Sequence, residues 1–186
     1  MEVEIVKLAL PVSRRRDHIQ GPDTAPATLL EYGDYECPFC GQAYPIIKQL
    51  QKALAKNLRF VFRNFPLSQV HPHAEPAAEA AESAGAQRKF WEMHDLLYEN
   101  QQVLDGDHLL QYANTLGLDM SRFLNDMSNH VHVPRIREDF LSGIRSGVNG
   151  TPSFYINGIR YNNSWDFETL LETLTYTIEE ADQQPK

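Results

Sequence analysis

The chain is poor in cysteine, with two among its 186 residues, Cys37 and Cys40. So few cysteines exclude a scaffold held by several disulfides, and also a zinc site closed by four cysteines. The chain also lacks a basic excess, because 25 acidic residues against 17 basic ones give a formal net charge of -8. Proteins that bind nucleic acid normally present a basic face, so we expect no nucleic-acid partner.

Long hydrophobic runs are absent as well. No stretch approaches the roughly 20 apolar residues of a membrane helix, and we expect no membrane span. The first residues do not resemble a secretory signal, because Glu2 and Glu4 replace a basic start and Lys7 interrupts the short apolar residues 5–10. As written, the sequence predicts a cytoplasmic protein, whereas a truncated periplasmic or secreted protein would look the same.

The two cysteines stand three positions apart, in Cys37-Pro38-Phe39-Cys40. They follow a strand predicted over residues 28–32 and open a helix, in which Pro38 suits the first position because its φ is already fixed. The unpaired N–H groups of a first helical turn stabilise a thiolate on Cys37. We therefore predict reversible thiol-disulfide exchange in which Cys37 attacks and Cys40 resolves.

Two other uses of the cysteine pair are weaker interpretations. His71 with His73, or His130 with His132, could complete a zinc site, but nothing in the sequence orders either pair around one ion. A purely structural disulfide would close a ring too short to restrict the unfolded chain much. We assign no metal site.

The first part of the chain predicts a strand-helix-strand unit. Residues 1–26 form an irregular lead with one edge strand, and the core begins near residue 27. The helix opened by Pro38 carries an apolar stripe from Phe39 to Leu54, and residues 58–63 alternate as a half-buried strand. Such a unit implies a parallel pair of strands.

Helices dominate the middle of the chain, and strands return at its end. Residues 66–147 predict five helices, of which Asp107 caps one and Asp119 another. Asn157-Gly158 predicts the tight turn of a hairpin over residues 153–161, and a final helix starts at residue 164.

Three motifs carry a resemblance to a known family: EYGDYECPFC at residues 31–40, FWEMHD at residues 90–95 and GTPSF at residues 150–154. With the order of the elements, they resemble the DsbA family of disulfide oxidoreductases over about residues 27–181. The resemblance implies an α/β, thioredoxin-like fold. A helical subdomain, residues 66–147, is then inserted between the β-α-β and β-β-α motifs of a core made of residues 27–65 and 148–182.

The resemblance also assigns a proton relay to Glu31. This residue stands six positions before Cys37, where thioredoxin-like proteins place a buried acid beneath the active site. Its carboxyl group would handle the proton of Cys40 as a mixed disulfide resolves, and burial would raise its pKa toward that task.

The predicted substrate-binding residues lie on both sides of the dithiol. Pro152 matches the cis-proline that the family sets opposite its cysteines, which leaves the Thr151 backbone free to pair with an extended substrate strand. Pro38 and Phe39, between the two cysteines, complete this set.

One departure from the family concerns the acidity of Cys37. DsbA carries histidine where Phe39 stands, so we expect the pKa of Cys37 to lie above the ~3.5 of DsbA, nearer the ~7 of thioredoxin. The protein should then be a milder oxidant than DsbA. We expect Asp34 and Glu36 to be exposed and their charges to oppose the thiolate.

These observations predict a monomeric thiol-disulfide oxidoreductase that acts without a bound cofactor. Its partners would be protein substrates with cysteine pairs, and a redox partner protein or small thiol. One alternative is a cytosolic reductase or isomerase kept reduced by a partner. The other is a binding module or chaperone whose cysteines do no chemistry.

Overall fold

The computed structural model describes residues 5–183, so residues 1–4 of the predicted lead and the last three residues lie outside it. Five strands and seven α-helices follow one another in this part. They are β1 (His18–Gln20), β2 (Ala27–Gly33), α1 (Pro38–Leu54), β3 (Leu58–Asn64), α2 (Ala74–Gly85), α3 (Phe90–Glu99), α4 (Gly106–Thr115), α5 (Met120–Ser128), α6 (Val133–Arg145), β4 (Ser153–Ile156), β5 (Ile159–Tyr161) and α7 (Phe167–Gln183).

The strands form one mixed sheet in the order β1-β3-β2-β4-β5. Strands β2 and β3 are parallel and joined by α1, as the sequence predicted, while β1, β4 and β5 pair antiparallel with their neighbours. The expected edge strand of the lead is β1. At the hairpin turn Asn157 and Gly158 both have positive φ, 48° and 81°, which a two-residue turn of this kind requires.

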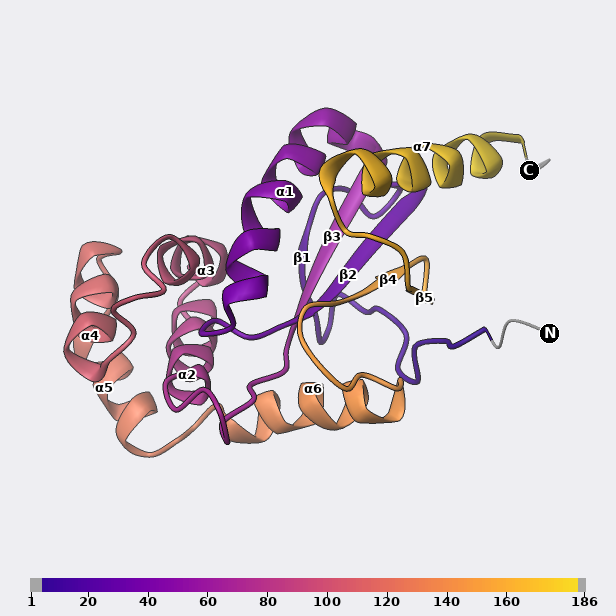
Figure 1. The fold of residues 1–186 in the computed structure, drawn as a ribbon. Helices are drawn as coiled ribbons and strands as arrows, with labels where there is room; N and C mark the ends of the chain where they lie inside the picture. Colours follow the sequence, from indigo (N-terminus) through magenta and orange to yellow (C-terminus); the bar gives the residue numbers. More distant parts are fainter. Residues whose placement is uncertain (1–4, 184–186) are drawn as a thin grey trace.

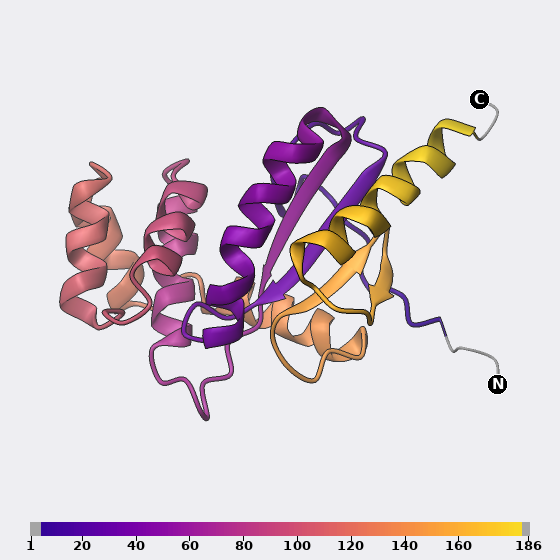
Figure 2. The ribbon, with the colours of Figure 1, turned by 45° about the horizontal axis from the view of Figure 1, so that its top comes forward.

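Helices cover both faces of the sheet (Figures 1 and 2). On one face Leu29 and Phe60 belong to the large core cluster that also holds α1 and α7. On the other face Leu30 and Val61 pack in a second cluster with Phe140 of α6. Helices α2 to α5 form a group beside the sheet, near the start of α1 (Figure 1). The architecture is therefore an α/β thioredoxin-like fold with an inserted helical region.

The prediction of a half-buried strand at residues 58–63 is wrong, because both faces of β3 are covered. On the second face the fully buried Arg63 donates to both carboxylate oxygens of Asp17, at 2.9 and 3.1 Å, and to the hydroxyl of Tyr32. The polar position at Arg63 therefore faces a buried ion pair and not solvent. The buried charge is tolerated because it is paired.

Three predictions about helices also need correction. The side chain of Asp105, not Asp107, caps α4 by accepting from the N–H groups of Asp107 and His108. Helix α7 begins at Phe167, where the carboxylate of Asp166 accepts from the N–H of Thr169 at 2.9 Å. Phe39 does not join the buried stripe of α1, because it is 58% exposed at the mouth of the site. The predicted cap at Asp119 is confirmed.

Candidate active site

The two cysteines occupy the start of α1. Cys37 has extended backbone angles at the N-cap position and Pro38 is the first helical residue, as predicted. Both cysteines are free thiols, 4% exposed at Cys37 and fully buried at Cys40. Cys37 thus lies at the rim of the site and Cys40 one turn further into the protein.

The two thiols differ in acidity. The pKa of Cys37 is lowered to about 5, and the largest cause is a hydrogen bond from the Cys40 thiol. Hydrogen bonds from the Thr151 side chain and from the N–H groups of Cys40 and Phe39 lower it further, whereas burial raises it. Burial raises the pKa of Cys40, as do its hydrogen bond to Cys37 and the charge of Glu31. A pKa of about 5 lies above the ~3.5 of DsbA, as expected, but it is not nearer the ~7 of thioredoxin, which was also expected.

Glu31 lies on β2 beneath the cysteines and is 1% exposed. Burial, and then the charge of Cys37, raises the pKa of its carboxyl group to about 8. Its Oε1 atom has no hydrogen-bond partner within residues 5–183. A carboxyl group poised near neutral pH beside a buried thiol can accept and return a proton.

Tyr98 on α3 joins this buried group, although the sequence analysis gave it no role. Burial raises the pKa of its hydroxyl, with the charges of Cys40 and Glu31 adding to the effect. Its hydroxyl is buried and finds no partner in the described part of the chain. The sequence signal was weak, because Tyr98 reads as one more apolar residue of an amphipathic helix.

The loop before β4 contacts Cys37 from the other side. The Thr151-Pro152 peptide bond is cis, which confirms the prediction for Pro152. The thiol of Cys37 donates to the carbonyl oxygen of Thr151 at 3.4 Å. The Thr151 hydroxyl is buried and has no partner within residues 5–183 while Cys37 carries its proton, so it is free to donate to a Cys37 thiolate. The roles of this loop and of the exposed Pro38 and Phe39 in substrate binding stay predictions.

Asp34 corrects the expectation of an exposed carboxylate, because it is 1% exposed. Its Oδ1 accepts from the N–H groups of Glu36 at 2.8 Å and Cys37 at 3.2 Å. Its Oδ2 accepts from the N–H of Leu67 and from Nδ1 of His71, at 2.9 and 2.8 Å. The turn into α1 has N–H groups without helical partners, and this carboxylate satisfies them.

The four histidines that the sequence offers for a zinc site each contact a different carboxylate. His71 pairs with Asp34, while Nδ1 of His73 lies 2.9 Å from the partly exposed Glu36. Within residues 5–183, no three His, Cys, Asp or Glu side chains are placed to hold a metal ion.

Gln101 connects the inserted helices to the site. Its Nε2 atom donates to the carbonyl oxygens of Tyr35 at 2.8 Å and Cys37 at 3.0 Å. The same turn is held by the Tyr35 hydroxyl, 3.1 Å from Nδ1 of the buried His94. No sequence motif singles out a glutamine 64 residues after the cysteine, and the analysis missed it.

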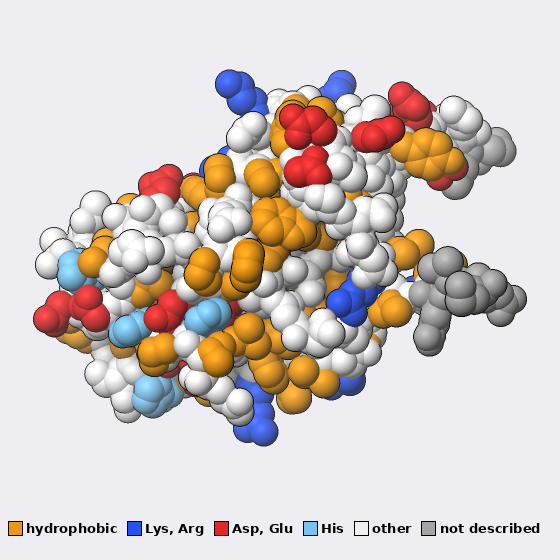
Figure 3. Space-filling model, viewed as in Figure 1, with side chains coloured by type: hydrophobic (Ala, Val, Ile, Leu, Met, Phe, Trp, Pro, Cys, Tyr) orange, Lys and Arg blue, Asp and Glu red, His pale blue; other side chains and the backbone are white. Residues whose placement is uncertain are grey.

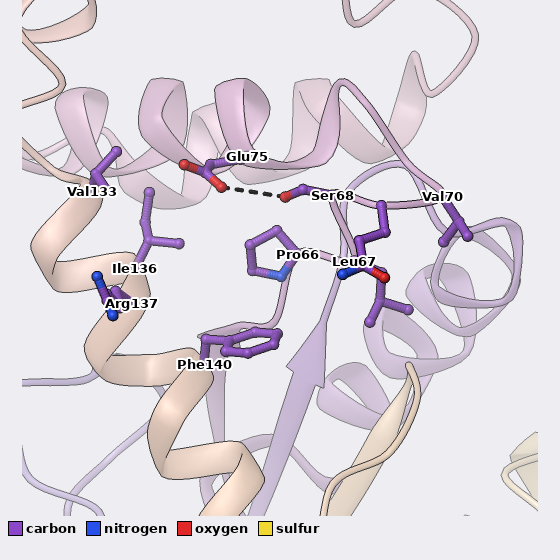
Figure 4. Close-up of a pocket in the computed structure, with 10 residues that line it drawn as sticks. Pro66, Leu67, Ser68, Val70, Glu75, Val133, Ile136, Arg137 and Phe140 are labelled. Atoms are coloured by element: carbon purple, nitrogen blue, oxygen red, sulfur yellow. Dashed lines mark hydrogen bonds between the residues drawn. The ribbon is translucent and has the colours of Figure 1, made fainter.

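The loop after β3 also contributes to a pocket. It lines this pocket, of about 630 Å³, with the start of α2 and one side of α6 (Figure 4). The lining is mainly apolar, and Glu75 accepts a hydrogen bond from Ser68 at its rim. On the molecular surface, hydrophobic side chains gather around the start of α1 and this loop, with histidine side chains beside them (Figure 3).

Residues 13–175 match a family model described as thioredoxin, and the chain therefore belongs to the thioredoxin family. Within it, the fold is that of the DsbA-like proteins. It is similar to BdbD from Bacillus subtilis, with a TM-score of 0.81, 22% identity and coverage of 90% of this chain and 95% of that one. It is also similar to alpha-DsbA1 from Wolbachia pipientis, with a TM-score of 0.81, 17% identity and coverage of 94% and 96%.

The curated relatives are longer proteins. The chain is 47% identical over 171 residues to Na(+)/H(+) antiporter NhaA 1 from Salinispora arenicola, covering 92% of this chain and 26% of the relative. It is 38% identical over 164 residues to Na(+)/H(+) antiporter NhaA from Herminiimonas arsenicoxydans, covering 88% and 26%. The chain thus spans about a quarter of the length of these relatives. None of the helices within residues 5–183 has the length and apolar character needed to cross a membrane.

Proposed function

We propose that the protein is a thiol-disulfide oxidoreductase that exchanges disulfides with cysteine pairs of other proteins. The observation that carries this proposal is the pair of free thiols at the start of α1, with Cys37 at the N-cap and Cys40 fully buried one turn further in. In keeping with this placement, the pKa is lowered to about 5 at Cys37 and raised at Cys40. A thiolate at the rim and a protonated thiol behind it give the asymmetry that a nucleophile and a resolving thiol need.

In the reducing direction the Cys37 thiolate attacks a substrate disulfide. A mixed disulfide forms, and one substrate sulfur leaves as a thiolate that takes a proton from solvent. Cys40 then loses its proton to the carboxylate form of Glu31 and attacks the sulfur of Cys37, so the second substrate thiolate leaves and takes a proton in turn. The substrate gains the two electrons that the Cys37–Cys40 pair loses. A redox partner protein or small thiol then reduces the Cys37–Cys40 disulfide again. The oxidising direction is the reverse, and there a disulfide of the redox partner takes up the two electrons.

Protein substrates fit the surroundings of Cys37. Pro38 and Phe39 are exposed beside it, and the Thr151 carbonyl oxygen lies against its sulfur, where an extended segment could pair with the backbone. No cofactor enters this chemistry. Because the curated relatives are named Na(+)/H(+) antiporters, a second candidate for the substrate is the thiols of a membrane transport protein.

The deciding experiment traps the mixed disulfide. Cys40→Ser should accumulate complexes through Cys37 with a disulfide-bonded test protein, whereas Cys37→Ser should form none. Wild-type protein should reduce the same test protein with glutathione as electron source. Retained client binding by the double Cys37→Ser, Cys40→Ser variant, together with no turnover by the wild type, would instead establish a binding module. The same trapping variant in membrane extracts tests the second candidate.

A further inference from the structure

Asp34 links two segments that are far apart in the sequence. One of its oxygens accepts from the N–H of Cys37, and the other accepts from Nδ1 of His71 and the N–H of Leu67. The loop after β3 and the turn that carries the nucleophile therefore share one buried carboxylate. His71 is its sole ion-pair partner within residues 5–183.

This arrangement poses an electrostatic problem. A buried carboxylate within one turn of Cys37 disfavours a second negative charge on the sulfur, because like charges repel strongly where water is excluded. Phe39 provides no compensating charge. A protonated His71 would make its pair with Asp34 neutral overall and so remove the repulsion.

We propose that His71 is a positioning residue that keeps the Cys37 thiolate stable by neutralising Asp34. This inference rests on the proposed function. It assigns to His71, on the loop after β3, the positive charge that Phe39 between the cysteines does not supply. His71 touches no reacting atom and acts through Asp34.

The surrounding charges are consistent with a protonated His71. Burial alone would lower its pKa, but the hydrogen bond to Asp34 and the charges of Asp34, Cys37 and Glu36 outweigh burial and raise it above its ordinary value. The other titratable groups that interact with Cys37 are Cys40 and Glu31. The coupling is reciprocal: if protonated His71 favours the thiolate, the thiolate favours protonated His71 by the same free energy.

The first test measures the acidity of Cys37 in His71→Gln, since an amide N–H can still donate to Asp34 but carries no charge. Thiolate absorbance is followed against pH in the reduced protein. The acid dissociation constant of Cys37 should fall at least about threefold, because the loss of a nearby positive charge makes the thiolate less stable. The control is His73→Gln on the same loop, whose histidine side chain is 47% exposed and pairs with Glu36; here solvent screens the charge and the constant should stay near wild type.

The second test uses the unmodified protein and so does not depend on the folding of a variant. NMR titration of the His71 ring should give a higher pKa in the dithiol form than in the disulfide form, because the disulfide carries no thiolate. An unchanged Cys37 constant in a folded His71→Gln, or equal His71 pKa values in the two redox forms, would overturn the proposal. Neither readout requires turnover, so loss of the proposed function would be seen separately, as a wild type that cannot reduce a test protein.

Discussion

The sulfur of Cys37 lies 3.4 Å from the carbonyl oxygen of Thr151, a residue 114 positions later in the sequence. The contact joins the start of α1 to the loop before β4. A carbonyl oxygen can accept from the thiol but offers nothing to a thiolate, so on ionisation other donors must replace it. The Cys40 thiol, the buried Thr151 hydroxyl and the N–H groups of Cys40 and Phe39 are those donors.

Removing the Thr151 hydroxyl should therefore weaken the thiolate. In Thr151→Val, which preserves the shape of the side chain, we expect the pKa of Cys37 to rise from about 5 by up to about one unit, as expected for one lost hydrogen bond to a charged group. Thiolate absorbance against pH measures it. Thr177→Val on α7, whose hydroxyl donates to the carbonyl oxygen of Thr173 in the same helix, serves as control, and equal pKa values in both variants would contradict the prediction.

Glu31→Gln should slow the resolution of mixed disulfides while the initial attack keeps its rate. The amide cannot take the proton that Cys40 must lose before it attacks, and a loss of general base catalysis typically costs about 10²-fold or more. Stopped-flow kinetics separates the two phases. If both phases matched the wild type, Glu31 would have no part in the mechanism.

Glu31 should also make stability depend on pH. Its pKa is raised from 4.5 to about 8 on folding, so the folded state holds a proton that the unfolded state releases. Stability is therefore lost as pH rises from 4.5 and levels off above about 8. Each pH unit in this range costs the wild type about 1.4 kcal/mol. The free energy of unfolding of Glu31→Gln, relative to the wild type, should therefore rise by up to about 3 kcal/mol between acidic and neutral pH. Denaturant unfolding of the reduced proteins at both pH values measures this, and a gap independent of pH would count against it.

Phe39→His should lower the pKa of Cys37 and raise the reduction potential. An imidazolium at the helix start favours the thiolate and hence the reduced state. A pKa change of one unit, if expressed fully in the two-electron couple, shifts the potential by roughly 30 mV. Titration in a glutathione buffer can resolve such a shift. A potential that stays constant or falls would show that the residues between the cysteines do not set it.

Gln101→Ala should destabilise the protein through the active-site turn. The substitution leaves the carbonyl oxygens of Tyr35 and Cys37 without their side-chain donor, and each such loss in a partly buried place costs about 1 kcal/mol or more. We expect the free energy of unfolding to fall by about 1 to 3 kcal/mol. The neighbouring Gln102→Ala is exposed and should stay within about 0.5 kcal/mol of wild type. Equal effects of the two substitutions would mean that the bonds of Gln101 contribute nothing.

The sequence alone determined the features that depend on neighbouring residues. Pro38 at the start of α1, the cap at Asp119 and the turn at Asn157-Gly158 each rest on backbone angles or hydrogen bonds within a few positions, which residue type fixes directly. The family resemblance added Glu31 and the cis bond before Pro152. The boundaries of the helical subdomain and the monomeric state stay predictions.

Only the tertiary structure decided which polar residues are buried and which residues pair with them. Asp34 and Arg63 look like exposed charges in the sequence, yet both lie inside, because His71 and Asp17 arrive from other segments to pair with them. Tyr98 on α3 and Gln101 in the turn after α3 also reach the site from a segment distant in the sequence. Burial and charge pairing depend on contacts between distant segments, and the physical cost of a buried charge is met only by a partner that folding places beside it.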